Sequence, residues 1–301
     1  MIKIENVTKT FDGFTALDNF SLEISKGSAY GLLGSNGAGK STLLRLISGI
    51  YRHDSGTITI DGEQIYDNVK LKQNLYFVSD DTVQFSNMKL GDMQTLVKTF
   101  YPKYSEEKFN KLQEVLQLPT DKKLSAFSKG MRRQAAVMCA LASGCDYLLF
   151  DEAFDGLDPT MRIVVKKMMI DAMVENDATI VISSHNLKEI EEFCDTAGLL
   201  HQGKLVFNRE LDSLKGDIHK VQTSFEKEGS VSKDDFPQLE ILHIRQSGSV
   251  INMIVRGDGG QTEAVLTERG AYFCDIMPLT LEEIFLYEME VLGYDFSGID
   301  R

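Results

Sequence analysis

Alternating apolar and polar residues dominate the first part of the chain. The alternation runs through residues 2–30, with a turn signal at Asp12-Gly13, and residues 56–60 form a second short stretch of the same kind. Such alternation places one face of a strand in the core and the other face in solvent. We therefore predict antiparallel strands at the N-terminal end.

Helical spacing replaces this alternation in the next long segment. Residues 90–118 carry apolar side chains three and four positions apart, Pro102 divides the segment, and Ser105 is suited to cap its second half. The pattern predicts a helical insertion over about residues 85–125.

Helix and strand patterns then alternate as far as about residue 200. Residues 147–150 and 179–183 are short apolar runs of the length expected for buried parallel strands. Their alternation with helical segments is typical of an α/β fold with a parallel-sheet core. Beyond this point the sequence becomes more polar and strand-like. We therefore predict an α/β domain over residues 1–208 and a small α+β accessory domain over residues 209–301.

Charge and cysteine content narrow the possible partners. The chain has 32 Lys and Arg against 45 Asp and Glu, a formal net charge of −13, so we expect no nucleic-acid partner. The four cysteines lack the paired spacing of a zinc site or a disulfide framework, which indicates reduced core thiols. Residues 1–5 do not resemble a signal peptide, and no apolar run approaches the length that spans a bilayer. We expect a cytoplasmic protein whose membrane role comes from a partner.

A phosphate-binding loop follows the first apolar strand. Eight residues fit the pattern G-x-x-x-x-G-K-[ST]: Gly34, Ser35, Asn36, Gly37, Ala38, Gly39, Lys40 and Ser41. The glycines let backbone N–H groups point at phosphates, and the helix that opens at Thr42 adds favourable electrostatics. Lys40 would place a positive charge on the β- and γ-phosphates, and Ser41 can ligate Mg²⁺. A chance match occurs in about one chain in a hundred of this length, and the strand–loop–helix context lowers that rate. The sequence therefore predicts a P-loop nucleotide-binding site.

Two carboxylates end the apolar run at residues 147–150. They are Asp151 and Glu152, and the carboxyl end of a parallel strand is where ligands bind. Such a pair is more often a solvated strand end, but the phosphate loop upstream favours a nucleotide site. We predict that Asp151 holds Mg²⁺ and that Glu152 polarises the attacking water as the general base.

The order of these motifs over residues 2–208 resembles the ATP-binding cassette (ABC) ATPase family. Four further features carry the resemblance: a signature variant at Phe127-Ser128-Lys129-Gly130-Met131, a D-loop at Gly156-Leu157-Asp158, a switch histidine at Ser183-Ser184-His185, and an adenine-stacking aromatic residue at Phe11. The resemblance implies that two chains pair head to tail around two ATP molecules. Ser128 and Gly130 would then contact the γ-phosphate bound by the opposite subunit, with Asp158 also at the nucleotide, and His185 would act with Lys40 and Glu152 in hydrolysis.

The chain departs from the family pattern at two places. Asp80 stands where the family usually has a glutamine that helps to bind Mg²⁺, and Gln84 is a possible shifted substitute. A carboxylate at position 80 can still hold Mg²⁺, so Asp80 joins Ser41 and Asp151 as a candidate metal ligand. In the signature, Lys129 and Met131 replace glycine and glutamine.

The resemblance also implies a function. We expect an ATP-hydrolysing subunit that pairs with itself or with a paralogous ATPase and powers a polytopic ABC permease from the cytoplasmic face of the membrane. The signature at residues 127–131 and the C-terminal extension look like those of bacterial exporters, so export is favoured over import. Two alternatives stay open. One is a soluble ABC ATPase that acts on a cytosolic assembly, and the other is an ATP-dependent signalling dimer with little turnover.

Overall fold

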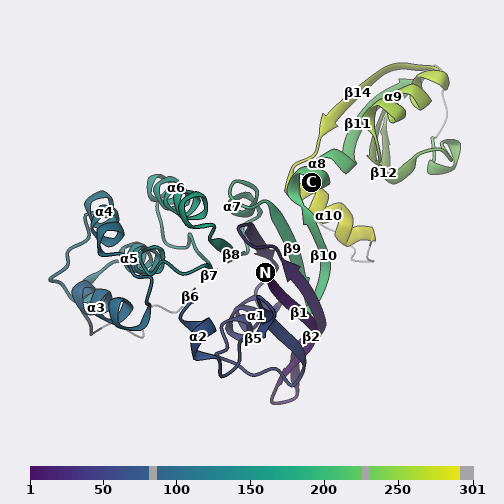
Figure 1. The fold of residues 1–301 in the computed structure, drawn as a ribbon. Coiled ribbons are helices and arrows are strands. Elements are labelled where there is room, and N and C mark those ends of the chain that lie inside the picture. The colour runs from purple at the N-terminus through teal and green to yellow at the C-terminus, as the bar shows by residue number, and fades with distance from the viewer. Residues whose placement is uncertain (81–86, 226–230, 292–301) are drawn as a thin grey trace. The chain divides into compact units, whose positions relative to one another are not determined.

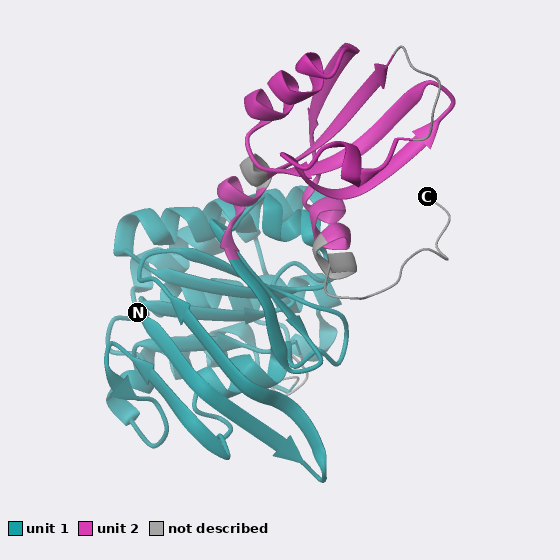
Figure 2. Cartoon of the chain, turned by 90° about the vertical axis from the view of Figure 1, so that its right-hand side faces the viewer, with its two compact units in different colours: residues 1–208 teal, residues 209–301 magenta. Residues whose placement is uncertain are grey.

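A computed structural model describes residues 1–80, 87–225 and 231–291. The chain divides into two compact units, residues 1–208 and 209–301, which Figure 2 colours separately.

The first unit begins with an antiparallel sheet of order β2-β1-β4-β5 (Figure 1). Its strands are β1 (Ile2–Phe11), β2 (Phe14–Ile24), β4 (Ser55–Ile60) and β5 (Glu63–Gln64). The predicted turn joins β1 to β2, and both of its residues have positive φ, 44° at Asp12 and 85° at Gly13. The prediction of N-terminal antiparallel strands is confirmed.

A second, six-stranded sheet forms the centre of this unit, in the order β10-β9-β3-β8-β7-β6. Its strands are β3 (Ala29–Leu33), β6 (Leu75–Val78), β7 (Tyr147–Asp151), β8 (Thr179–Ser184), β9 (Thr196–His201) and β10 (Lys204–Glu210). The run from β6 through β7, β8 and β3 to β9 is parallel, as predicted. Every residue of β3, β7 and β8 is buried, which explains why these strands read as continuous apolar runs. Their carboxyl ends lie at one edge of the sheet, where the phosphate loop and the acidic pair follow.

Helices surround this sheet. They are α1 (Lys40–Ile47), α2 (Val69–Lys72), α3 (Leu90–Phe100), α4 (Glu106–Leu116), α5 (Lys129–Ala142), α6 (Pro159–Asn176) and α7 (Leu187–Glu191), with a 3₁₀ turn at Leu124–Ala126. Apolar residues of α1 share one core cluster with residues of both sheets, so α1 lies between them. The helices α3 and α4 form the helical insertion and pack against α5 (Figure 1). Ser105 caps α4 as expected, because its hydroxyl accepts from the Lys108 N–H at 3.1 Å.

The second unit is a small α+β structure. It contains α8 (Leu211–Asp217), β11 (Ile218–Phe225), a 3₁₀ turn (Lys233–Asp235), β12 (Glu240–Ser247), β13 (Val250–Arg256), α9 (Gly259–Glu268), β14 (Ala271–Pro278) and α10 (Leu281–Val291). The strands form one antiparallel sheet of order β12-β13-β11-β14. Its core includes Met253 and Val255 of the sheet and Leu266 of α9. Across both units, no helix in the described part of the chain has the length and apolar character needed to cross a membrane.

Candidate active site

The phosphate loop connects β3 to α1 with a backbone that requires glycine. Gly39 has φ +112° at the N-terminal cap of α1, and a Cβ there would lie 2.6 Å from the Ala16 carbonyl oxygen. At Gly34 a Cβ would lie 2.4 Å from the Leu200 carbonyl oxygen. A side chain at either position would push the loop off the sheet. The two glycines therefore hold the loop close to β2 and β9.

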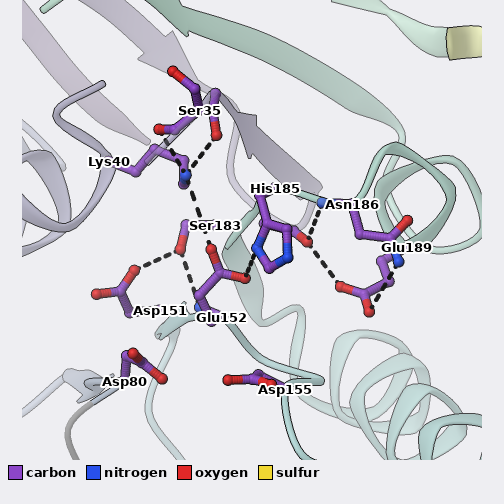
Figure 3. Close-up of polar contacts among 12 residues, drawn as sticks. Ser35, Lys40, Asp80, Asp151, Glu152, Asp155, Ser183, His185, Asn186 and Glu189 are labelled. Atoms are coloured by element: carbon purple, nitrogen blue, oxygen red, sulfur yellow. Dashed lines mark hydrogen bonds and ion pairs between the residues drawn. The ribbon is translucent and has the colours of Figure 1, made fainter. Parts of the chain in front are cut away.

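Lys40 lies buried at the start of α1 and points back at its own loop. Its Nζ donates to the Gly34 carbonyl at 2.6 Å and to the Ser35 carbonyl at 3.3 Å, and lies 3.9 Å from Glu152 Oε1 (Figure 3). Burial lowers the pKa of Lys40, while the charges of Glu152 and Asp151 act in the opposite direction. The loop thus encloses one ammonium group beside the acidic pair.

The two carboxylates at the end of β7 are fixed by Ser183 of the neighbouring strand. The Ser183 hydroxyl donates to Asp151 Oδ1 at 2.6 Å and accepts from the Glu152 N–H at 3.1 Å (Figure 3). Glu152 has φ +52°, a left-handed conformation that costs a glutamate about 1–3 kcal/mol and clusters at functional sites. Asp151 is 1 % exposed, and its Oδ2 is buried with no hydrogen-bond partner among the described residues. That oxygen suits a metal ion, which would satisfy it.

His185 follows β8 and meets the same glutamate. Its Nδ1 lies 3.0 Å from Glu152 Oε2, while 61 % of its side chain remains exposed (Figure 3). The next turn is held by Ser184, whose hydroxyl donates to Glu189 Oε2 at 2.8 Å and accepts from the Asn186 N–H at 3.0 Å. The Glu152 carboxylate therefore lies between the Lys40 ammonium and the His185 ring.

A cavity of about 300 Å³ joins Lys40 and Glu152 to the β1–β2 hairpin. Its lining consists of Phe11, Phe14, Ala16, Ser35, Asn36, Gly37, Gly39, Lys40, Ser41, Thr42, Asp80 and Glu152. One end is apolar and the other carries the phosphate loop, a division that suits a base at one end and phosphates at the other. A larger groove of about 680 Å³, between α4 and α6, contains none of the predicted site residues. The chemistry therefore points to the smaller cavity.

Phe14 and Ala16 were not predicted as lining residues. Phe14 is the register partner of Phe11 across the hairpin, so the turn signal at Asp12-Gly13 could have indicated it. Phe11 is 37 % exposed and packs edge-on against Tyr51, with ring centroids 5.3 Å apart. The contact with Tyr51 holds the Phe11 ring, and no sequence signal indicated it.

Seven predicted site residues are not in the lining of this cavity. Gly34 and Ala38 belong to the phosphate loop, Asp151 and His185 lie beside Glu152, and the other three, Ser128, Gly130 and Asp158, belong to the signature and the D-loop. Ser128 caps α5, where its hydroxyl accepts from the Met131 N–H at 3.1 Å, and Asp158 caps α6 by accepting from the Met161 N–H at 3.0 Å. Gly130 lies against the D-loop, because a Cβ there would be 2.5 Å from the Gly156 carbonyl oxygen. The signature and the D-loop thus form one packed surface.

The two departures from the family pattern each have an ionic partner. Lys129 Nζ pairs with Asp155, the residue that directly precedes the D-loop. Asp80, which lines the cavity, accepts from Arg133 of α5 at 2.9 Å through Oδ1. Gln84 lies outside the described residues.

Thiol and metal chemistry are limited elsewhere in the described chain. All four cysteines are free, and burial raises the pKa of Cys139 and of Cys145 to about 12, in keeping with inert thiols. Among the described residues no group of three or more His, Cys, Asp or Glu side chains could hold a metal alone. A Mg²⁺ ion that shares its ligands with nucleotide phosphates needs no such group.

Comparisons with known proteins identify the family and the fold. Residues 17–155 match the family described as ABC transporter. The ABC transporter ATP-binding protein YtrB of Bacillus subtilis (strain 168) is 31% identical over 288 residues, 95% of this chain and 97% of that protein. The bacitracin transport ATP-binding protein BcrA of Bacillus licheniformis is 27% identical over 301 residues, 97% of each chain. Among solved structures, the dimeric structure of MJ0796, a bacterial ABC transporter cassette, shares the fold with a TM-score of 0.64 at 22% identity, over 70% of this chain and 99% of that one.

Proposed function

Because the chain belongs to the ATP-binding proteins of the ABC transporter family, we propose that it hydrolyses ATP in the cavity beside Lys40 and so drives a separate membrane permease. One observation carries the proposal. The Glu152 carboxylate lies 3.9 Å from Lys40 Nζ and 3.0 Å from His185 Nδ1, at the shared edge of three parallel strands. A base, a phosphate-binding cation and a switch histidine therefore converge at one point.

The phosphate loop and Lys40 bind the phosphates of ATP. Backbone N–H groups from residues 34–42 and the N-terminus of α1 supply donors for the β- and γ-phosphates. Lys40 now donates to two loop carbonyls, and its Nζ exchanges them for phosphate oxygens when ATP enters. At the other end of the cavity, Phe11 stacks on the adenine.

Glu152 and His185 carry out the hydrolysis step. Glu152 orients a water molecule in line with the γ-phosphorus and accepts its proton as the new P–O bond forms and the bond to the bridging oxygen breaks. His185 holds the second carboxylate oxygen of Glu152 and contacts the γ-phosphate. The leaving group is ADP, and the products are ADP and phosphate.

The residues fit a Mg²⁺ site at the phosphate end of the cavity. Asp151 Oδ2, the Ser41 hydroxyl and Asp80 Oδ2 are the protein oxygens that would hold the ion together with phosphate oxygens and water. When bound, Mg²⁺ neutralises charge on the β- and γ-phosphates. Ser183 binds Oδ1 of Asp151 and leaves Oδ2 without a hydrogen bond to the described residues.

A second chain completes each site in this proposal. Ser128, Gly130 and Asp158 lie outside the chain's own cavity, so a head-to-tail dimer, formed with a second copy or with a paralogue, would present them to the partner's ATP. A two-fold dimer of identical chains then contains two complete sites. Hydrolysis of ATP to ADP removes the γ-phosphate that both halves contact and opens the dimer.

The names of related proteins support the proposed permease partner and the proposed direction of transport. BcrA is named for bacitracin transport, and SrtF of Streptococcus pyogenes, 30% identical over 230 residues, is named for lantibiotic transport. We therefore propose export as the direction, with the chain bound to a polytopic permease at the cytoplasmic face of the membrane. The two alternatives, a soluble motor and a signalling dimer, predict no stoichiometric permease.

One experiment tests the function. Tagged Glu152→Gln protein is purified from detergent-solubilised native membranes with ATP and Mg²⁺, and its partners are identified by mass spectrometry. Glu175→Gln, on the exposed surface of α6, is the matched control. Stoichiometric capture of a polytopic membrane protein is the expected result, together with loss of the wild-type rate of phosphate release in Glu152→Gln. Capture of soluble partners alone, with wild-type hydrolysis intact, overturns the transport role. Equal rates of phosphate release in the wild type and in Glu152→Gln overturn the role of Glu152.

A further inference from the structure

Arg133 is a buried charged side chain that the proposed mechanism does not use. It belongs to α5, one turn after the Ser128 cap, and is 1 % exposed. Its Nη1 donates to the Ser79 carbonyl at 3.2 Å and to the Asp151 carbonyl at 3.1 Å, and its Nη2 donates to Asp80 Oδ1 at 2.9 Å. Burial lowers the pKa of Arg133, and the charge of Asp80 opposes this effect. A buried guanidinium with three partners fixes the position of the groups around it.

These partners belong to the phosphate end of the sheet. Asp151 ends β7 and carries the oxygen suited to a metal, and Ser79 and Asp80 follow β6. Arg133 itself lies on the helix whose first turn carries the signature. The Arg133 side chain therefore connects the signature turn of α5, which would face the partner's nucleotide, to the chain's own nucleotide cavity.

The chemistry of position 80 explains why an aspartate suits this arrangement. A carboxylate has two acceptor oxygens. Asp80 Oδ1 accepts from Arg133, whereas Oδ2 makes no hydrogen bond with the described residues, and about half of the side chain (51%) is exposed in the cavity wall. A glutamine amide has a single acceptor oxygen, and its NH₂ group would meet the guanidinium donors if that oxygen turned to the cavity. The carboxylate can therefore serve Arg133 through Oδ1 and a ligand in the cavity through Oδ2, with one oxygen for each.

We propose that Asp80 and Arg133 form a positioning pair that couples the chain's own nucleotide site to its signature helix. Asp80 Oδ2 takes part in binding the Mg²⁺–nucleotide, Oδ1 holds Arg133, and Arg133 fixes the first turns of α5, which carry Ser128 and Gly130. Nucleotide binding in the chain's own site thereby sets the position in which its signature meets the nucleotide of the partner chain. This inference rests on the proposed nucleotide site and deepens it.

The competing explanation is an ion pair that only stabilises the fold. Removing one partner of a buried charge pair is destabilising whatever the function, so loss of stability does not separate the two. The separating readouts are the exchange of backbone amides in the first turns of α5, residues 128–134, and the gain in nucleotide affinity that Mg²⁺ gives.

The experiment is a double-mutant cycle with Asp80→Asn, Arg133→Gln and both together in the full chain. Asp146→Asn, whose ion pair with Lys103 lies outside the cavity, is the matched control. Hydrogen exchange is measured without nucleotide, and binding of a non-hydrolysable ATP analogue is measured with and without Mg²⁺. Each single variant is expected to speed exchange over residues 128–134, with no further increase in the double variant. The affinity gain from Mg²⁺ should fall about tenfold in Asp80→Asn and by a smaller factor in Arg133→Gln.

Two results overturn the pair. One is unchanged exchange over residues 128–134 in Asp80→Asn. The other is an Arg133→Gln protein that is less stable yet keeps the full affinity gain from Mg²⁺. Should Arg133→Gln fail to fold, Arg133→Lys keeps the charge without the two-pronged contact, and Asp80→Asn alters an exposed group. Neither measurement requires hydrolysis or a partner chain. A wild-type protein that neither hydrolyses ATP nor dimerises would therefore count against the proposed function, while the double-mutant cycle would still test the Asp80–Arg133 pair.

Discussion

The Ser183 hydroxyl donates to Asp151 Oδ1 at 2.6 Å across two adjacent parallel strands, and Oδ2 of the same carboxylate is left buried without a hydrogen-bond partner among the described residues. The same hydroxyl accepts from the N–H of Glu152, so its proton direction is fixed by its two neighbours. One serine thus orients the candidate metal ligand and the candidate base together.

Ser183→Ala should therefore weaken the metal site. Loss of the hydroxyl frees the Asp151 carboxylate to rotate, and loss of an orienting partner of this kind typically costs about tenfold or more in metal affinity. We expect the Mg²⁺ concentration that gives half-maximal phosphate release to rise about tenfold. Ser143→Ala, which removes another fully buried serine, is the control for general loss of stability. An unchanged Mg²⁺ requirement in Ser183→Ala would refute the orienting role.

Gly130→Ala should slow hydrolysis about a hundredfold without weakening ATP binding by the single chain. An added Cβ would lie 2.5 Å from the backbone oxygen of Gly156, so the signature and the D-loop cannot keep their packing. Loss of correctly placed donors typically costs about a hundredfold in rate. Lys40→Ala should be equally inactive, because it removes the phosphate-binding ammonium from the cavity.

Mixing these two inactive proteins tests the head-to-tail arrangement directly. In a mixed dimer one site combines the intact loop of the Gly130→Ala chain with the intact signature of the Lys40→Ala chain. Partial recovery of phosphate release on mixing is the expected result. A mixture as inactive as its parts would argue that each chain completes its own site.

The sequence predicted best what depends on local pattern. The parallel core follows from apolar runs such as 147–150, because strands buried on both faces leave no polar alternation. The glycine spacing of residues 34–39 indicates the loop because the backbone there excludes side chains.

Contacts between distant segments could not be predicted in this way. Arg133 is a buried charge on a helix, and nothing in a helical pattern distinguishes it from its neighbour Arg132, since charged residues are normally exposed. The role of Ser183 depends on which strand pairs with β7, and that pairing is a property of the whole sheet. The substitution at Asp80 was visible in the sequence, but its partner was not.

Phe11→Ala should weaken ATP binding through the base. Phe11 lies at the apolar end of the cavity, held edge-on by Tyr51 with Lys9 Nζ 5.1 Å from the ring centroid. Loss of an aromatic stacking platform costs about 1–3 kcal/mol per base, or roughly 5- to 150-fold in the dissociation constant. Equilibrium binding of a fluorescent ATP analogue measures the change. Phe100→Ala, exposed on α3 and absent from the cavity lining, should bind as the wild type does.

The accessory unit should lose stability in mild acid because of His219. This side chain is 5 % exposed in β11, and its Nε2 lies 3.1 Å from the Thr262 hydroxyl of α9. Burial lowers the pKa of His219 below its ordinary value of 6.5, against the raising effect of the Asp258 charge. Below that ordinary value the unfolded chain binds a proton that the folded unit does not, so the free energy of unfolding falls as the pH decreases through this range and is fully restored above it.

Amide exchange over residues 250–256, corrected for its intrinsic pH dependence, measures this effect. Wild-type protection should decrease as the pH falls from about 7.5 to about 5.5, because His219 takes up a proton in the unfolded chain over this range but stays neutral while buried in the folded unit. His219→Gln keeps a polar side chain but cannot titrate, so its protection should change less over the same interval. Equal pH dependence in the two proteins would assign the acid sensitivity to other groups and show that the His219–Thr262 contact does not govern the stability of this unit.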